Sequence, residues 1–275
     1  MSKVRYKEDV QLTERHKQTV SKMIDHIIII RWSVDLNRNE FVKKIDLLFK
    51  EERLKERFEL FEKYCFPSLS QQTYCDFKVI IVIDRDLPCM WKEKLENLLC
   101  NHKNFIIHVW NKEDIFENNA WLRCYTENKK FICTTRMDDD DMIHADANKF
   151  FILCLFNFRK IFQKYKMNFN VSNGVYLHME NNEDVYLIKC TNKELAVFMS
   201  YITPSEIENN VYSYCHDELK NYDEIKKVQI FYKNAPLFGV SNHAWGNDNR
   251  LQRFSNKKEE KITQKEIYDL FALKN

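Results

Sequence analysis

Residues 131–141, FICTTRMDDDD, pass directly from a run of β-forming residues into four consecutive aspartates, Asp138–Asp141. The run Phe131–Met137 is rich in apolar and β-branched side chains, which predicts a buried strand. Adjacent like charges repel, so a folded chain carries four of them at low cost only where water or a cation shares the site. The stretch therefore predicts either a solvated acidic turn or a cation site at the end of a strand.

The spacing of the four aspartates predicts that they point to two different faces. Side chains alternate along a strand, so Asp138 and Asp140 are expected on one face and Asp139 and Asp141 on the other. Two carboxylates on one face are hard oxygen donors of the kind that Mg²⁺ and Mn²⁺ prefer. The acidic run alone leaves the turn and the metal site as alternatives.

The composition is that of a globular protein without a special affinity for nucleic acid. Of 275 residues, 44% are hydrophobic and 14% aromatic, which is enough for a sizeable core. The 43 basic and 41 acidic residues nearly balance, which argues against a protein that coats nucleic acid. The nine cysteines are odd in number and include no C-x-x-C pair, so a reducing compartment is the simpler inference.

The chain also lacks the patterns of a membrane-spanning or exported protein. Its first residues, MSKVRYKEDV, are too charged for a signal peptide, and no apolar run approaches the ~20 residues of a bilayer span. We therefore expect a soluble cytoplasmic protein without a transmembrane segment, for which any membrane association is peripheral.

Glycine is scarce, which restricts how this chain could bind a nucleotide. Only three glycines occur, at positions 174, 239 and 246, so neither G-x-G-x-x-G nor a Walker loop is present. Any nucleotide phosphates would have to be held by a metal ion and by side chains.

Apolar runs and amphipathic stretches alternate along the first part of the chain. Strands are expected at 26–34, 77–83, 105–110 and 131–137, and helices at 41–66, 91–99, 112–127 and 142–165. This alternation indicates βαβ units and a mainly parallel, doubly wound sheet, in which ligands bind beyond the carboxyl ends of the strands. Arg31, Asp84 and the acidic run all fall at such strand ends, which favours a ligand site over a solvated turn.

The pattern changes at both ends of this alternating region. Residues 1–25 are polar, and we expect them to be helical or loosely attached. Beyond residue 165 we expect paired strands at 169–178 and 184–190, followed by short strands at 228–232 and 237–240. A helix is expected over 205–219, where Ser205 and Glu208 fit a capping box, and a final helix over 263–273. No linker or repeat interrupts the chain, so residues 1–275 are expected to form one domain.

Four stretches carry a resemblance to a known family. They are IIIIRWSVD (27–35), RFELFEKYCFPSLSQQTYCDFKVIIVIDRDLP (57–88), TTRMDDDDMI (134–143) and, more weakly, APLFGVSNHAWGNDNR (235–250). With them the chain resembles the putative rhamnosyltransferase family of glycosyltransferases. The second stretch, in which a helix leads into a strand ending in Asp84, is the most specific. The family typically has an uncharged residue at the second position of the acidic motif, where this chain has Asp139.

The resemblance implies an α/β fold of the GT-A type. Such a fold has a Rossmann-like, mixed but mainly parallel central sheet flanked by helices, and a smaller antiparallel sheet on the acceptor side. The resemblance divides the single domain into a nucleotide-sugar-binding half (26–165), an acceptor-binding half (166–250) and a C-terminal helix (251–275). It implies a hexosyltransferase that moves rhamnose, with inversion, from a nucleotide diphosphate sugar such as UDP- or dTDP-rhamnose to a hydroxyl of an oligosaccharide or glycan.

The resemblance also implies a metal cofactor and its ligands. In GT-A enzymes an Asp-x-Asp motif holds Mn²⁺ or Mg²⁺ against the diphosphate, and the cation stabilises the charge that develops on the leaving group. Asp140 is the first candidate ligand, and Asp138 would bind the metal ion or the ribose hydroxyls. A further metal ligand is expected from a late loop, which points to His243.

The remaining candidate residues have both functional and structural interpretations. Asp84 would bind the nucleobase or ribose, although Asp followed by Pro also favours a turn. Arg31 interrupts an apolar strand, so it is expected to pair with a carboxylate or with the diphosphate. Arg136 would contact the nucleotide or form a structural ion pair.

Inverting transfer requires a carboxylate base that takes the proton of the acceptor hydroxyl. Asp217 is the candidate for this role, and Asp141 is a catalytic candidate on the acceptor side. Other possible bases in the second half of the chain are Glu218, Glu180 and Asp184.

Two other functions compete with glycosyl transfer. A nucleotidyltransferase also uses paired aspartates and a divalent ion, but its substrate is attacked at phosphorus. A non-enzymatic interaction module could carry an acidic turn that binds cations incidentally. Release of a nucleoside diphosphate from a sugar nucleotide would indicate glycosyl transfer, and release of pyrophosphate would indicate nucleotidyl transfer.

Overall fold

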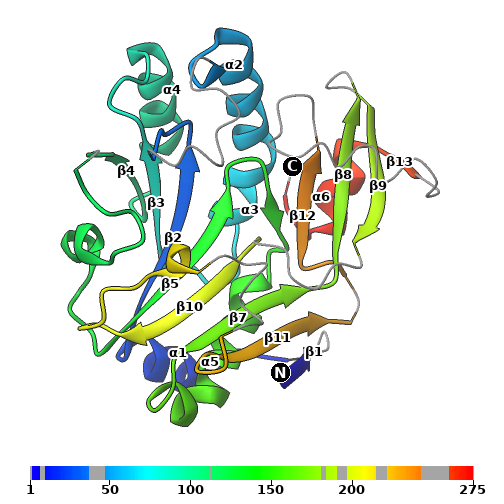
Figure 1. The fold of residues 1–275 in the computed structure, drawn as a ribbon. Coiled ribbons are helices and arrows are strands. Elements are labelled where there is room, and N and C mark those ends of the chain that lie inside the picture. The colour runs from blue at the N-terminus through cyan, green and yellow to red at the C-terminus, as the bar shows by residue number, and fades with distance from the viewer. Residues whose placement is uncertain are drawn as a thin grey trace.

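An eight-stranded sheet forms the centre of the molecule (Figure 1). The structure, a computed structural model, describes residues 2–6, 10–36, 47–111, 113–180, 184–190, 197–214, 222–233, 235–242 and 260–274. The strand order is β1-β11-β7-β10-β5-β2-β3-β4. These strands are β1 (Ser2–Tyr6), β2 (Ile24–Trp32), β3 (Lys78–Ile83), β4 (Phe105–Val109), β5 (Phe131–Asp138), β7 (Met167–Ser172), β10 (Met199–Pro204) and β11 (Lys226–Tyr232).

The sheet is mixed but mainly parallel, which confirms the expected fold class. β5, β2, β3 and β4 pair in parallel, and so do β1 with β11 and β11 with β7. β10 lies between β5 and β7 and runs antiparallel to both. The central strands β2 and β3 contain the continuous apolar runs 27–30 and 79–83 because both faces of the sheet are covered.

Helices pack on one face of this sheet and aromatic loop residues on the other. Ile28 of β2 belongs to a core that includes residues of α2 (Glu51–Leu60), α4 (Cys89–Leu99) and α5 (Ala147–Phe162). Its neighbour Ile29 points to the opposite face, where the core includes Trp110, Phe116, Trp121 and Tyr212. The alternation of side chains along β2 therefore divides the protein into two packed layers.

The helix expected over 41–66 begins at Glu51 and does not end at Pro67. α2 passes into a π-helical turn (Phe61–Cys65) and then into α3 (Phe66–Ser70). Pro67 occupies the first turn of α3, where a missing backbone N–H is tolerated. Residues 41–46 lie outside the described part of the chain.

Two expected helices are wrong for a shared reason. The segment 112–127 contains only a 3₁₀ helix (Ala120–Tyr125), and residues 205–214 contain only a short one (Val211–Ser213) among the residues described. The two segments hydrogen-bond to each other instead of forming their own helices. Asn210 donates from Nδ2 to the carbonyl oxygen of Phe116 at 2.7 Å, and Asn119 donates from its backbone to Glu208.

Other boundaries also differ from expectation. The strand expected over 169–178 is divided at Asn173, whose φ of 65° turns the chain from the large sheet into a second one. The helix expected over 142–165 begins only at Ala147, after the short strand β6 (Met142–Ile143). The N-terminal residues include a strand, β1, as well as the helix α1 (Glu14–Ser21).

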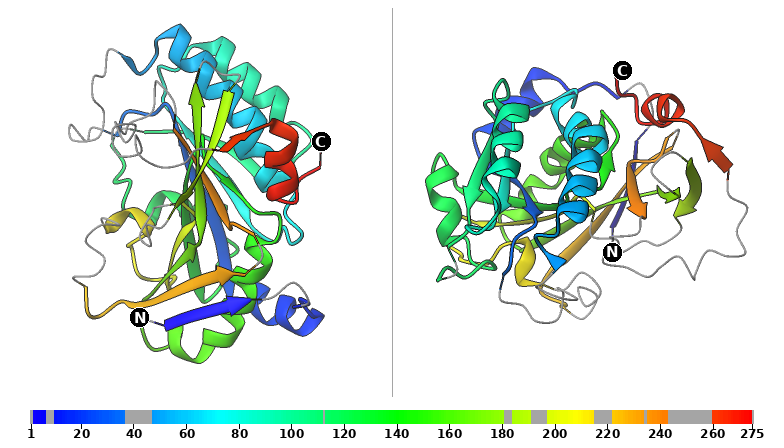
Figure 2. Two further views of the ribbon diagram at one scale, coloured as in Figure 1. Left: turned by 90° about the vertical axis from the view of Figure 1, so that its right-hand side faces the viewer. Right: turned by 90° about the horizontal axis from the view of Figure 1, so that it is seen from above.

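The second, smaller sheet has the order β13-β9-β8-β12-β6. β8 (Gly174–Glu180) and β9 (Asp184–Cys190) form the expected antiparallel pair, whereas β12 (Phe238–Asn242) runs parallel to β8. Figure 2 shows α6 (Gln264–Leu270) beside this sheet, with β13 (Glu260–Ile262) at its edge. Because β6 follows Asp141 directly, the acidic turn joins the two sheets.

None of the helices in the described part of the chain has the length and apolarity that crossing a bilayer requires. The division of the chain into a nucleotide-sugar half and an acceptor half stays a prediction.

Candidate active site

The acidic run forms a turn at the carboxyl end of β5. The strand ends at Asp138, and the backbone N–H of Asp141 donates to the carbonyl oxygen of Asp138 at 3.3 Å. The alternation expected across all four aspartates therefore stops at the first, and Asp138 and Asp140 do not share a strand face. The thiol of Cys65, in the π-helical turn, donates to the same carbonyl oxygen at 3.7 Å.

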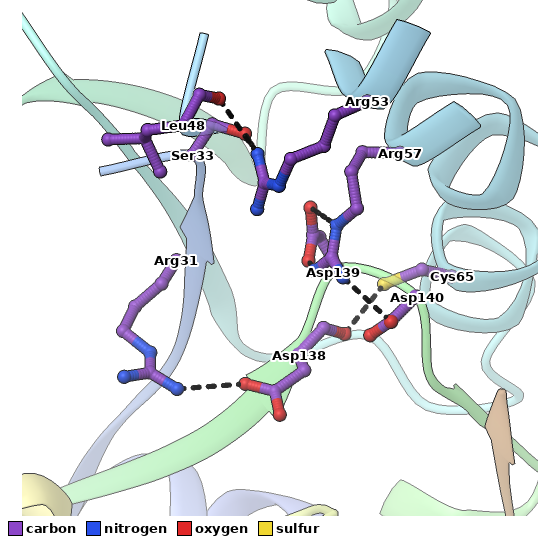
Figure 3. A network of polar contacts seen from close by, with 9 residues as sticks. All are labelled: Arg31, Ser33, Leu48, Arg53, Arg57, Cys65, Asp138, Asp139 and Asp140. Atoms are coloured by element: carbon purple, nitrogen blue, oxygen red, sulfur yellow. Dashed lines mark hydrogen bonds and ion pairs between the residues drawn. The ribbon is translucent and has the colours of Figure 1, made fainter. Parts of the chain in front are cut away.

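Arg57, on α2, binds two of the four aspartates (Figure 3). Its Nε donates to Oδ2 of Asp139 at 3.0 Å, its Nη2 contacts Oδ1 of the same carboxylate, and its Nη1 donates to Oδ2 of Asp140 at 2.8 Å. The side chain of Asp139 is fully buried and that of Arg57 is 8% exposed. Asp139 is therefore held in a bidentate ion pair.

Arg31 and Arg136 form a second group around Asp138. Nη2 of Arg31 lies 3.2 Å from Oδ1 of Asp138, whose side chain is 40% exposed. The guanidinium carbons of Arg31 and Arg136 lie 5.2 and 5.1 Å from the centre of the Tyr212 ring. The Nε atoms of both arginines are buried without a hydrogen-bond partner. The site therefore contains donors that an anionic ligand could satisfy.

The environment separates the acidities of two of the aspartates. Loss of water around Asp138 acts to raise its pKa, but the positive charges of Arg31 and Arg136 outweigh this effect and hold the pKa below its ordinary value. Burial, followed by the negative charges of Asp140 and Asp138, holds the pKa of Asp141 well above the ordinary value. Asp138 therefore ionises more readily than Asp141, and the negative charge is stronger at the Asp138 end of the turn.

Asp84 lies at the end of β3 and supports the turn that follows it as well as the loop after β2. Its Oδ1 accepts the backbone N–H of Asp86, and its Oδ2 accepts that of Asp35, both at 2.9 Å. Each carboxylate oxygen has a second lone pair, so these bonds leave acceptor capacity for a ligand. The geometry is compatible with both interpretations of Asp84, the turn and the nucleotide contact.

Arg53 lies one helical turn before Arg57 and reaches the end of β2. Its Nη1 donates to Oγ of Ser33 and to the carbonyl oxygen of Leu48, each at 2.9 Å. Ser33 follows β2 directly and has a φ of 51°, in the left-handed region that a serine seldom adopts.

Three residues of this site were not anticipated from the sequence: Arg53, Arg57 and Tyr212. The two arginines are four residues apart on a helix, a spacing that places them on one face, but no local pattern shows that this face meets the acidic turn. The guanidinium carbon of Arg31 lies 5.2 Å from the centre of the Tyr212 ring, and no sequence pattern around Tyr212 predicts this contact.

Several predicted residues cannot be placed in this site. Asp217, Glu218 and His243 lie outside the described residues. Glu180 and Asp184 face each other in the register of β8 and β9, at the turn between these strands. The candidate residues that the structure brings together are therefore Arg31, Arg136 and the aspartates, with Asp84 on the neighbouring strand end.

The acidic turn has the donor chemistry of a site for a hard divalent cation. Asp138, Asp140 and Asp141 are close enough for their charges to act on one another, and carboxylate oxygens suit Mg²⁺ or Mn²⁺. In the described part of the chain, no group of three or more His, Cys, Asp or Glu side chains is arranged to hold a metal ion. Ligand oxygens or residues outside that part would have to complete the coordination.

Comparisons with known proteins identify the family. A family model described as "Putative rhamnosyl transferase" matches residues 29–232. A comparison with curated proteins finds no match. Residues 1–349 of TarS from S. aureus, in complex with UDP-GlcNAc, match with 9% identity and a TM-score of 0.39, over 80% of this chain and 59% of that one. The inositol-1-phosphate CTP transferase from T. maritima matches with 12% identity and a TM-score of 0.35, over 90% of this chain and 95% of that one.

These structural similarities are remote, and the chain spans only about three fifths of the TarS chain, so the family match carries the identification. The matched range extends over most of the chain and contains the arginines around the acidic turn, the turn itself, Asp84 and Tyr212. The chain therefore belongs to the family described as putative rhamnosyl transferases.

Proposed function

We propose that this protein is a metal-dependent glycosyltransferase that transfers rhamnose, with inversion, from UDP- or dTDP-rhamnose to a hydroxyl of a glycan acceptor. The observation that carries the proposal is the acidic turn 138–141 at the carboxyl end of β5, in a chain of this family. Arg31 and Asp84 end the neighbouring parallel strands at the same edge of the sheet, where ligands of α/β folds bind.

Asp138, Asp140 and His243 are the proposed ligands of Mn²⁺ or Mg²⁺. The carboxylates supply hard oxygen donors, and the partial exposure of Asp138 leaves it open to a ligand. When bound, the ion would act as a Lewis acid that stabilises negative charge on the departing diphosphate. Asp140 also contacts Arg57, so this arginine would help to orient one of the proposed metal ligands.

The nucleotide diphosphate is assigned to the residues around Asp138. Arg31 and Arg136 carry buried Nε–H groups that lack acceptors, and phosphate oxygens are suitable acceptors for them. Asp138 is proposed to accept hydroxyl groups of the ribose, and Asp84 hydrogen bonds from the nucleobase or ribose. No glycine-rich loop is available for the phosphates, so side chains take over this role.

The transfer itself needs one proton acceptor. The acceptor hydroxyl oxygen forms a bond to the anomeric carbon while the bond from that carbon to the diphosphate oxygen breaks, and the hydroxyl proton passes to a carboxylate. We assign this carboxylate to Asp217 and place Asp141 on the acceptor side of the donor sugar. The seven cysteines that the structure describes as free thiols suit the reducing cytoplasm, where we expect the protein to work.

A donor assay tests the proposal directly. The protein is incubated with Mn²⁺ or Mg²⁺, a mixture of short glycans, and UDP-, dTDP- or GDP-rhamnose, with UDP-GlcNAc as a comparison donor. We expect release of the nucleoside diphosphate from a rhamnose donor, and loss of this activity in EDTA. Release of pyrophosphate would instead support nucleotidyl transfer, and absence of both turnover and nucleotide binding would support an interaction module.

A further inference from the structure

The two arginines on the inner side of α2 have different surroundings. Arg57 directs Nε, Nη1 and Nη2 to two carboxylates, so its donors are taken up by the acidic turn. Within the described ranges Arg53 donates through Nη1 alone, and both acceptors, Oγ of Ser33 and the carbonyl oxygen of Leu48, are uncharged. No carboxylate in the described ranges forms an ion pair with Arg53.

The free edge of Arg53 has the geometry for binding an oxyanion. Nε and Nη2 point along one side of a guanidinium group and together form the fork that binds two oxygens of a carboxylate or phosphate. Among the described residues these two nitrogens make no hydrogen bond, since both bonds of Arg53 come from Nη1. The bonds from Nη1 hold the guanidinium plane in place and leave this edge available.

The charge around Arg53 also favours an anionic ligand. Burial and, after it, the nearby charge of Arg57 lower the pKa of Arg53 to about 10, and Asp140 opposes the decrease only in part. Two arginines four residues apart on a helix repel each other when no anion lies between or beside them. A bound anion at the free edge of Arg53 would relieve this repulsion.

The position of Arg53 connects it with the proposed donor site. Figure 3 shows Arg53 extending from α2 toward the end of β2, whereas Arg57 turns to the aspartates. Its partner Ser33 lies two residues beyond Arg31, which pairs with Asp138. The strained backbone of Ser33 thus presents its hydroxyl to Arg53 at the edge where the parallel strands end.

We propose that Arg53 binds the diphosphate of the sugar nucleotide through Nε and Nη2, and that Ser33 and Leu48 hold it in the orientation for this contact. The inference rests on the proposed function, because it takes a nucleotide diphosphate sugar as the ligand. Arg53, a helix residue outside the acidic motif, thus contacts the phosphates, whereas Arg57 positions the acidic turn.

Binding measurements on three variants test this role. Isothermal titration calorimetry with UDP, dTDP and inorganic pyrophosphate is carried out on the wild type, R53Q, R53K and K55Q. We expect R53Q to bind the preferred nucleoside diphosphate at least about tenfold more weakly, because a charge-assisted bidentate contact is lost. R53K keeps the charge but loses the fork, so an intermediate affinity is expected. Lys55 is on the same helix with its side chain 69% exposed, and K55Q should bind like the wild type.

The outcomes separate the role of Arg53 from the proposed function. Affinity of R53Q for the corresponding nucleoside should stay within about twofold of the wild type, which shows that the variant is folded. If the wild type binds a nucleoside diphosphate and R53Q and R53K bind it equally well, the role of Arg53 is refuted while the glycosyltransferase proposal stands. If the wild type neither binds nor turns over any sugar nucleotide, both are refuted.

Discussion

Arg57 and Asp139 form a buried ion pair that joins α2 to the turn after β5, 82 residues further along the chain. The same guanidinium group also contacts Asp140, so one positive charge serves two of the four aspartates. A turn of four aspartates can therefore remain folded because a helix supplies a buried counter-charge.

Removal of Arg57 should destabilise the protein strongly. In Arg57→Ala two buried carboxylates lose their counter-charge, which typically costs about 3–5 kcal/mol in free energy of unfolding. Asp139→Asn should cost less, because the guanidinium keeps Asp140 as its charged partner. Urea denaturation measures both values. Lys92→Ala removes an exposed ion pair on α4 as a control, and a change of less than about 1 kcal/mol is expected there. Equal effects of Lys92→Ala and Arg57→Ala would contradict the prediction.

Replacement of Asp140 should change how the enzyme responds to metal ions. We expect Asp140→Asn to reduce kcat/KM by about 100-fold or more and to raise the Mn²⁺ concentration that gives half-maximal activity, because a charged ligand becomes neutral. The measurement is donor turnover over a series of Mn²⁺ concentrations. Asp86→Asn, an exposed aspartate at the same edge of the sheet, is the control. An Asp140→Asn enzyme with wild-type activity and metal response would remove Asp140 from the ligand set.

The ring of Tyr212 matters more than its hydroxyl group. Both Arg31 and Arg136 lie over this ring, whereas the hydroxyl makes a 3.4 Å hydrogen bond to the carbonyl oxygen of Ile29 and a further hydrogen bond with Arg31. Tyr212→Phe should change the free energy of unfolding by about 1 kcal/mol or less. Tyr212→Leu loses both cation–π contacts, each worth about 0.5–2 kcal/mol, and should also raise the KM for the donor. Similar KM values for the two variants would show that the ring does not position the arginines.

Protonation of His26 should destabilise the fold at acidic pH. Burial lowers the pKa of His26 to about 3, against a weak opposing effect of Asp76. Its Nε2 lies 2.9 Å from Oγ1 of Thr135, and its Nδ1 is buried without a partner. Below pH ~6.5 the unfolded chain binds a proton that the folded protein does not, so stability falls as pH decreases toward 3.

The size of this effect is measurable with one variant. Between pH 7 and pH 5 the wild type should lose about 2 kcal/mol more in free energy of unfolding than His26→Gln, which can keep the hydrogen bond to Thr135 but does not titrate. Denaturation curves at both pH values give the difference. Parallel pH profiles for the two proteins would refute the role of His26.

Much of the fold follows from local patterns in the sequence. The apolar runs 27–30 and 79–83 predict buried central strands because such strands need no polar face, and the structure has β2 and β3 there. Because strands alternate with helices along the chain, the strands are expected to be parallel, and their carboxyl ends then share one edge of the sheet. Arg31, Asp84 and Asp138 do lie at that edge, for the same reason.

The helices expected over 112–127 and 205–219 do not form in the described residues 113–127 and 205–214, because propensity describes a segment in isolation. The backbone groups at 116–119 and 207–210 find partners in each other, and these contacts replace helical hydrogen bonds. The partner of a hydrogen bond between segments some 90 residues apart cannot be identified from either segment alone.

The sequence by itself determined the sheet, the edge at which its parallel strands end and the presence of four carboxylates there. Tertiary structure alone decided the contacts of these carboxylates: the turn after Asp138 ends the strand alternation, Arg57 pairs with Asp139 and Asp140, and Arg31 pairs with Asp138. The physical reason is that periodicity reports which face of an element is buried, whereas the pairing of charges depends on which other element packs against that face.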